Sequence, residues 1–131
     1  MAEEKKIVLV VEDEVPMLQV LRDKLRESGF ATFQARDGEE GLSLALAHHP
    51  DVILLDLLMP KMDGMTMMSK LRQDVWGKKV PVIILTNVSA DTDATIKAII
   101  AYQPAYYLVK SDVKLDGIVE KIQSVLSKKD K

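Results

Sequence analysis

The chain has 131 residues, of which 47% are apolar and 29% are charged, and its formal net charge is −2. This length and composition predict one domain with a buried core, and the slight excess of acids argues against direct binding of nucleic acid or anionic membranes. The absence of cysteine excludes disulfides, thiolate catalysis and cysteine-ligated metal sites. No stretch approaches the ~20 apolar residues of a membrane span, and residues 1–6 form no apolar signal segment, so we expect a cytoplasmic protein without a membrane partner.

Short apolar strands alternate with helical patterns from one end of the chain to the other. The strands are short runs rich in branched aliphatic or aromatic residues, and the helices show apolar residues at helical spacing. In chain order the pattern predicts a strand at residues 7–11, a helix from Pro16 to a stop at Ser28 and Gly29, a strand at 30–35, a helix at 39–48, a strand at 52–55, a helix at 65–74, a strand at 80–85, a helix at 92–102, a strand at 105–109 and a last helix at 115–126.

Each helix is expected to bury one apolar face against the strands. Five strand–helix units with short connections predict the α/β class, with a doubly wound parallel sheet that helices cover on both faces. The residues expected to point inward are Leu18, Leu21 and Leu25, then Leu42, Ala45 and Leu46, then Ile96, Ile99 and Ile100, and finally Leu115, Ile118, Val119, Ile122, Val125 and Leu126.

Polar and charged residues stand directly after several of these strands. Glu12 and Asp13 follow the first strand, Asp56 follows the third, Thr86 the fourth and Lys110 the fifth. A carboxylate at the end of a strand buried on both faces costs free energy unless a cation or hydrogen bonds compensate it. Because the carboxyl ends of parallel strands share one edge of the sheet, where such folds bind ligands, these residues are expected to form an active site.

A divalent cation would relieve the repulsion between three neighbouring carboxylates. Mg²⁺ suits the cluster, since it prefers oxygen ligands and commonly shares an oxygen of a phosphate group. Asp56 would then be free to act as a nucleophile and form an aspartyl phosphate, while Lys110 and the Thr86 hydroxyl hold the other phosphoryl oxygens. The pattern therefore favours phosphoryl transfer.

Simpler interpretations of the same residues remain open. In these, Glu12 or Asp13 only caps the helix that follows, since acids favour helix N-termini. Thr86 forms only a turn at the end of its strand, and Lys110 is an ordinary surface lysine. A capping role alone does not explain an acid at the ends of both strands.

These residues resemble those of the receiver domain of two-component response regulators, the CheY-like family. The resemblance extends from about Lys5 to Leu126 and implies a flavodoxin-like (βα)5 fold with strand order 2-1-3-4-5. It is carried by the pair Glu12-Asp13, by Asp56 with Met59-Pro60 and Asp63-Gly64 behind it, by Thr86, and by the run Tyr107-Leu108-Val109-Lys110.

The resemblance implies a role for each acid. Asp56 would accept a phosphoryl group from a phosphohistidine, on a sensor histidine kinase or a phosphotransfer protein. Asp13, Asp56 and the backbone carbonyl of Leu58 would ligate Mg²⁺ (or Mn²⁺) directly, and Glu12 would act through water. Such a protein is not a conventional enzyme, although it would catalyse its own phosphorylation.

The resemblance also implies a conformational switch. The Thr86 hydroxyl would move toward the new phosphoryl group and the Tyr107 side chain would rotate inward. The phosphoryl group would add a charge of about −2, which shifts the equilibrium between two conformations of these side chains. The shift would change the surface formed by helix 92–102, strand 105–109 and the last helix. The expected partners of this surface are a downstream effector protein, an output domain that the chain lacks, or a second copy in a homodimer.

Two residues depart from the family pattern. Ser111 follows Lys110 where proline is usual, and because a cis bond before a non-proline residue costs about 2.5–4 kcal/mol, a trans bond or a remodelled loop is expected. Asn87 is larger than the residue usual after the switch threonine. Leu58 and Val88 flank the site without offering polar help to an attacking water, so we expect slow self-dephosphorylation.

Three functions compete at this point. The first is a phosphorylation-dependent switch formed by a single receiver domain of residues 1–131, with a core of about residues 5–126 and no output domain. The second is a phosphorylation-independent interaction module, a pseudo-receiver that kept only the fold. The third is a flavin-binding protein of the same topology, which the acidic run after the first strand disfavours because it would repel a phosphate.

Overall fold

Five parallel strands form one sheet in the order β2-β1-β3-β4-β5. The computed structural model describes residues 4–129, with the side chains of residues 4–128. The order confirms the predicted doubly wound α/β sheet, because the chain runs outward from β1 in both directions. The strands are β1 (Ile7–Val11), β2 (Ala31–Ala35), β3 (Val52–Leu55), β4 (Val82–Thr86) and β5 (Tyr106–Val109).

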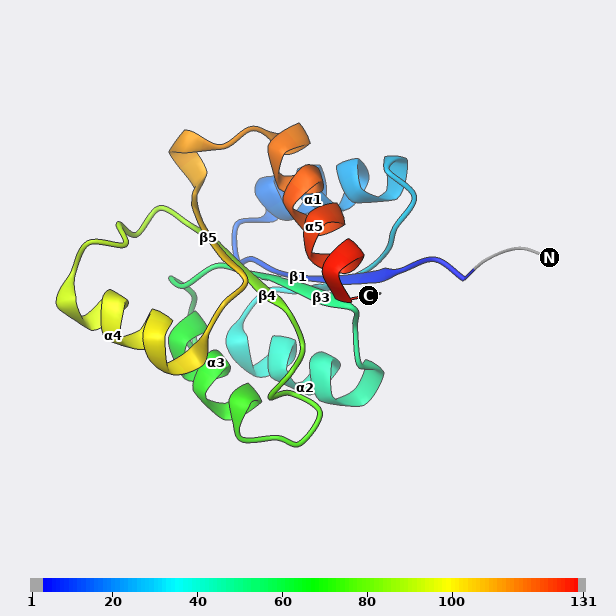
Figure 1. Ribbon diagram of the computed structural model, residues 1–131. Coiled ribbons are helices and arrows are strands. Elements are labelled where there is room, and N and C mark those ends of the chain that lie inside the picture. The colour runs from blue at the N-terminus through cyan, green and yellow to red at the C-terminus, as the bar shows by residue number, and fades with distance from the viewer. Residues whose placement is uncertain (1–3, 130–131) are drawn as a thin grey trace.

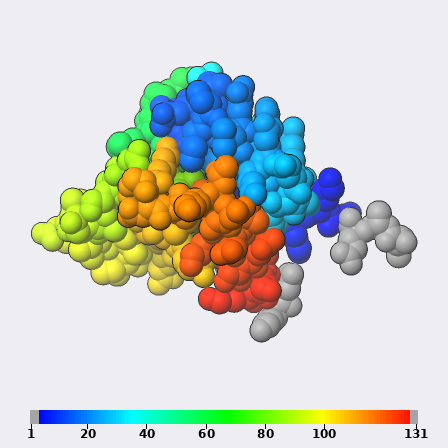
Figure 2. Space-filling model, turned by 90° about the horizontal axis from the view of Figure 1, so that it is seen from above, coloured from blue at the N-terminus to red at the C-terminus, as the bar shows by residue number. Residues whose placement is uncertain are grey.

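Helices cover both faces of this sheet (Figure 1). Helices α1 (Val15–Glu27) and α5 (Leu115–Lys129) lie on one face, and α2 (Gly38–His48), α3 (Gly64–Arg72) and α4 (Asp93–Tyr102) lie on the other. Figure 2 looks onto the first face, where the blue surface of α1 and the orange to red surface of α5 adjoin. A short 3-10 turn, η1 (Lys110–Asp112), connects β5 to the segment before α5.

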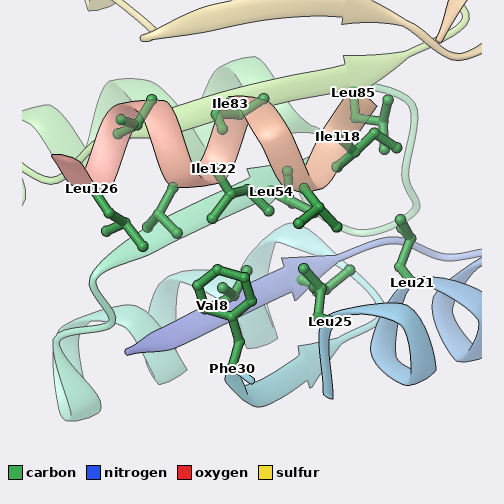
Figure 3. Packing of buried hydrophobic residues seen from close by; sticks show 14 of the residues in the cluster. Val8, Leu21, Leu25, Phe30, Leu54, Ile83, Leu85, Ile118, Ile122 and Leu126 are labelled. Atoms are coloured by element: carbon green, nitrogen blue, oxygen red, sulfur yellow. The ribbon is translucent and has the colours of Figure 1, made fainter. Parts of the chain in front are cut away.

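The central strands are buried on both sides, and this explains their nearly continuous apolar sequence. Alternate residues of β1 point to opposite faces, so that Val8 packs under α1 and α5 while Leu9 packs against α2 and α3. Figure 3 shows part of the first of these layers, in which Leu25 of α1 and Ile122 of α5 belong to one apolar cluster with Val8 and Leu54 of the sheet. Two apolar layers therefore hold the strand ends in fixed positions.

The predicted inward residues of α1 and α5 are correct, but three predictions on other helices are wrong. Leu46 is 38% exposed, Ile96 is 44% exposed and Ile100 is 69% exposed. On α2 the prediction for Ala45 is confirmed, and Gly41 is buried beside it; a side chain at Gly41 would run into Val11 and Met67, so the close approach of this helix leaves Leu46 at its margin. Apolar spacing alone could not distinguish these positions.

Helix α4 packs on the rest of the protein with a different side from the one that the spacing of its isoleucines predicted. Thr95 is the buried residue of this helix, and its backbone N–H is bound by the hydroxyl of the N-cap residue Thr92 at 3.2 Å. A helix beside the edge strand of a sheet has fewer neighbours to cover its apolar residues. Exposed isoleucines therefore remain on its outer surface.

The last helix is longer than its sequence pattern predicted. Helix α5 continues to Lys129, three residues beyond the end at residue 126 that the sequence predicted. Residues 1–3, part of the segment judged to lack a signal sequence, and residues 130–131 lie outside the described residues. Within the described range, no helix combines the length and the apolar character that crossing a membrane requires.

Candidate functional site

Three acids meet at the edge of the sheet where β1 and β3 end. Val11 and Leu55 are paired in register, so Glu12 and Asp56, the next residues, emerge side by side. The backbone N–H of Asp56 donates to the Val11 carbonyl at 3.0 Å, and that of Glu12 donates to the Ala35 carbonyl at 2.9 Å. One carboxylate oxygen each from Glu12, Asp13 and Asp56 lies within 4.8 Å of the others. The predicted convergence of these acids is confirmed.

Lys110 brings a positive charge into this cluster from the end of β5. Its Nζ lies 2.6 Å from Glu12 Oε1 and 3.1 Å from Asp56 Oδ2, and its side chain is only 10% exposed. Burial lowers the pKa of this ammonium, but the hydrogen bonds to Glu12 and Asp56 outweigh that effect and raise the pKa. Lys110 is therefore not an ordinary surface lysine.

The charge on Glu12 is less well compensated. Its side chain is 2% exposed, and burial raises its pKa although the hydrogen bond from Lys110 acts in the opposite direction. Three carboxylates face one ammonium, so the cluster retains an excess of negative charge. An all-oxygen donor set of this kind, formed by Glu12, Asp13 and Asp56, fits a hard divalent cation.

Thr86 and Tyr107 lie beside the acidic cluster and share a partner. Thr86 ends β4, is fully buried, and accepts a hydrogen bond from the Val88 N–H at 3.4 Å. The Tyr107 hydroxyl donates to the Val88 carbonyl at 2.7 Å. Val88, in the segment after β4, is thus hydrogen-bonded both to the Thr86 hydroxyl and to the Tyr107 hydroxyl of β5.

Leu58 lies two residues after Asp56, and its backbone N–H faces the Asp56 carboxylate. Its N–H approaches Asp56 Oδ1 at 3.4 Å, while its side chain is 64% exposed. Val88, across the site, is half-buried, and Asn87 is exposed. The rim around Asp56 is accordingly apolar on two sides, as the sequence suggested.

Tyr106 and Tyr107 point to opposite faces of the sheet, as the alternation of a strand requires. Burial, and then the charge of Asp56, raise the pKa of Tyr107 above its usual value. The pKa of Tyr106 is lowered by its hydrogen bond with Ser124 and by the nearby charges of Lys128 and Lys121.

The two tyrosines are therefore expected to ionise in separate steps. In an absorbance titration of phenolate between pH 8 and 12, Tyr106→Phe should remove the component that ionises first, because Tyr106 has the lowered pKa. Tyr107→Phe should remove the last component. Identical titration curves for the two variants would contradict the assigned environments.

The capping and turn interpretations account for only part of these contacts. Glu12 Oε2 accepts a hydrogen bond from the N–H of Glu14 at 3.1 Å, so it supports the start of α1 as well as facing Lys110. The N-cap of α1 is Glu14, which makes no side-chain cap. The Glu14 carboxylate lies 3.6 Å from Lys110 Nζ. The sequence analysis did not predict this contact, although Glu14 is the third acid in the run that begins at Glu12.

The peptide bond before Ser111 is trans, because the described residues contain no cis peptide bond. The chain turns here through η1, which begins at Lys110 itself. The expectation of a trans bond at this departure from the family pattern is confirmed. Lys110 nevertheless reaches the carboxylates, so proline at position 111 is not required to direct its side chain.

The turn that follows Asp56 depends on Gly64. A methyl group at Gly64 would overlap the Asp56 carbonyl oxygen and the backbone of Leu57. Gly64→Ala is expected to lower the free energy of unfolding by about 2 kcal/mol, because this backbone must move to make room. The measurement is a urea unfolding curve.

Gly117→Ala provides the control for this prediction. Gly117 lies in α5, and its nearest obstacle is a methyl group of Val113 at 3.3 Å, which can yield. This substitution should raise the free energy of unfolding by roughly 0.5 kcal/mol, through the reduced freedom of the unfolded chain. Equal effects of the two substitutions would contradict the close approach at Gly64.

Comparison with known proteins defines the class to which this fold and site belong. A family model described as the response regulator receiver domain matches residues 8–123. The chain belongs to this family, and it is a receiver domain of two-component signalling with an acidic pocket of Glu12, Asp13 and Asp56.

Individual relatives agree with this classification. The chain is 38% identical over 81 residues to the polar-differentiation response regulator DivK of Brucella ovis, over 62% of this chain and 66% of that protein. It is also 38% identical over 90 residues to the "Probable transcriptional regulator ycf27" of Porphyridium aerugineum, over 69% of this chain but only 36% of that protein. The matched segments thus span from about a third to two thirds of these relatives.

Solved structures show the same architecture. The chemotaxis protein CheY4 of Vibrio cholerae superposes with a TM-score of 0.83 at 26% identity, covering 93% of this chain and 99% of that one. A CheY-like receiver domain protein from Methanospirillum hungatei superposes with a TM-score of 0.88 at 20% identity, covering 97% and 98% of the two chains, and supports the fold alone.

Proposed function

We propose that this chain is a phosphoacceptor switch in which Asp56 receives a phosphoryl group from a phosphohistidine. The observation that carries the proposal is the position of Asp56, whose carboxylate lies in a cluster with Glu12 and Asp13 and is 3.1 Å from the Lys110 ammonium at the edge of the sheet. A sensor histidine kinase or a phosphotransfer protein would supply the phosphoryl group. The reaction would take place in the cytoplasm.

The residues of the site suit an in-line transfer. An Asp56 carboxylate oxygen forms a bond to phosphorus while the bond from phosphorus to the histidine nitrogen breaks, and the electron pair returns to the imidazole. Lys110, which contacts Asp56 Oδ2 in this structure, would bind one phosphoryl oxygen. The Thr86 hydroxyl, which accepts from the Val88 N–H, would move a short distance and bind another phosphoryl oxygen. The carboxylate thus attacks from a position fixed by the end of β3.

A divalent cation completes the site. Asp13, Asp56 and the Leu58 carbonyl would hold Mg²⁺ or Mn²⁺, and Glu12 would act through water. Bound there, the ion neutralises charge that develops on the phosphoryl oxygens. Asp13 makes no ion pair with Lys110 among the described contacts, so its carboxylate is available to a metal.

The proposed readout begins at Val88. Its carbonyl accepts from Tyr107 and its N–H donates to Thr86, so a hydroxyl drawn toward a new phosphoryl group would disturb both contacts. The change would reach the surface of α4, β5 and α5, where an effector protein, an output domain or a second copy would bind. We propose that residues 5–126 act as one receiver domain in this role.

Phosphoryl uptake tests the proposal directly. Purified protein incubated with acetyl phosphate and Mg²⁺ should gain the mass of one phosphoryl group, and EDTA should prevent the gain. A phosphorylated histidine kinase or phosphotransfer protein should replace acetyl phosphate as donor. No uptake from any of these donors would leave the second candidate, an interaction module that works without phosphorylation.

The aspartyl phosphate is expected to hydrolyse slowly. Leu58 and Val88 flank Asp56 with apolar side chains, so no polar group at these positions orients an attacking water. In Mg²⁺ after removal of the donor, the phosphorylated fraction should persist for minutes or longer, and Val88→Glu should shorten this lifetime by offering a group that can bind the water. A lifetime of only seconds in the unaltered protein would contradict this expectation.

A further inference from the structure

A second cavity lies at the end of the sheet where the strands begin, opposite the acidic pocket. Its volume is about 560 Å³, and it lies between the segment before β4, the segment before β5 and the last turns of α5. Among the described residues, four cationic side chains line it and no acid does, although the chain as a whole carries more acids than bases. We call this cavity the basic pocket, and its cations are Arg72, Lys78, Lys79 and Lys128.

Arg72 forms the inner part of the basic pocket and has no carboxylate partner among the described residues. Its Nε donates to the Tyr102 carbonyl at 2.8 Å, and its Nη1 donates to the carbonyls of Gly77 and Val80, both at 2.7 Å. Burial lowers the pKa of this guanidinium. A half-buried charge held only by neutral carbonyls is incompletely compensated, so an anion beside it is favourable.

The lysines of the basic pocket are free to meet an anion. Lys78, Lys79 and Lys128 are exposed and make no ion pair within the described part of the chain. The carboxylate of Asp74, four residues before Lys78, is directed to the backbone N–H of Gly77 at 2.8 Å. The loop carrying Lys78 and Lys79 is therefore held in place without neutralising them.

An apolar and aromatic wall completes the basic pocket. It consists of Val80 and Val125, which are buried, of Pro81, and of the half-buried Tyr106. Lys121 lies 4.8 Å from the centre of the Tyr106 ring and adds to the positive charge. A volume within the roughly 300–1,000 Å³ of small-molecule sites, with cations on one side and an aromatic wall on the other, suits an amphipathic anion better than a bare ion.

We propose that the basic pocket binds a nucleoside polyphosphate, with its phosphates on Lys78, Lys79 and Lys128 and its base against Pro81 and Tyr106. Arg72 adds charge from the inner wall while keeping its bonds to the backbone. The site is separate from the acidic edge, so binding needs neither Asp56 nor a phosphoryl group on it.

The single tryptophan of the chain offers a probe for this binding. Trp76 lines a smaller hollow that shares Lys78, Lys79 and Val80 with the basic pocket. Tryptophan fluorescence, excited beyond the absorption of adenine, is followed while ATP is added in EDTA at constant ionic strength, and calorimetry supplies a measurement independent of Trp76. We expect saturable binding below about 1 mM, and at least roughly tenfold weaker binding of adenosine and of inorganic triphosphate.

Matched lysine variants decide the location of the site. The double variant Lys79→Ala/Lys128→Ala should weaken ATP binding at least roughly tenfold. Lys70→Ala/Lys97→Ala removes the same charge from exposed positions outside the basic pocket and should leave the affinity unchanged, as should Asp56→Asn. Absence of saturable ATP binding, equal affinity of ATP and inorganic triphosphate, or equal loss in both double variants would each overturn the proposal.

Discussion

Asp56→Asn is expected to abolish phosphoryl uptake from acetyl phosphate under conditions in which the unaltered chain gains one phosphoryl group. Asparagine keeps the size of the side chain but removes the nucleophilic carboxylate oxygen, which now lies 3.1 Å from Lys110 Nζ. No other carboxylate lies at the end of β3, and Glu12 is held at 2.6 Å by the same ammonium. Intact-mass spectrometry after incubation with Mg²⁺ measures the effect.

Two further variants separate the acceptor from its surroundings. Asp13→Asn removes a proposed metal ligand but leaves Asp56, so uptake should persist and require a higher Mg²⁺ concentration. Asp23→Asn changes a carboxylate that is 64% exposed and pairs with Arg22 on the outside of α1, so uptake should equal that of the unaltered chain. Undiminished uptake by Asp56→Asn would show that another residue is the acceptor.

Lys110→Met is expected to lower the free energy of unfolding by about 3 kcal/mol in the absence of divalent cations. Methionine retains most of the volume but removes the charge from an ammonium that is 10% exposed and contacts both Glu12 and Asp56. Two buried carboxylates and Asp13 would then face one another without a cation. Urea unfolding in EDTA measures the loss, and saturating Mg²⁺ should reduce it, because a bound cation stabilises the folded state.

Lys61→Met is the matched control. Lys61 Nζ lies 3.9 Å from Asp37 Oδ2, and its side chain is 67% exposed, so this surface pair should contribute less than about 1 kcal/mol. A loss for Lys110→Met no larger than that for Lys61→Met would contradict a compensating role of Lys110 in the acidic cluster.

Much of the fold could be predicted because local sequence and burial agree along the sheet. The run Val52–Leu55 is buried on both faces, and its apolar residues leave no alternative to a central strand. The last helix was predicted correctly because its stripe of Ile118, Ile122 and Val125 faces the sheet. On α4 the same reasoning failed, since spacing identifies an apolar side but not the amount of surface available to cover Ile96 and Ile100.

The candidate site was predictable to a similar extent. Parallel strands must deliver their end residues to one edge, and this alone brought Asp56, Glu12 and Lys110 together. The contact of Glu14 with Lys110, and the shared bonds of Tyr107 and Thr86 to Val88, depend on loop and side-chain conformations that residue types do not determine. Those contacts required the structure.

Identification of the phosphorylated residue tests the central proposal most directly. After incubation with acetyl phosphate and Mg²⁺, borohydride reduction converts an aspartyl phosphate to homoserine, which tandem mass spectrometry locates in the sequence. Homoserine at position 56 alone is the predicted result. Homoserine at Asp13 or elsewhere with none at position 56, or its absence from a protein that has gained a phosphoryl group, would contradict the assignment of Asp56 as the acceptor.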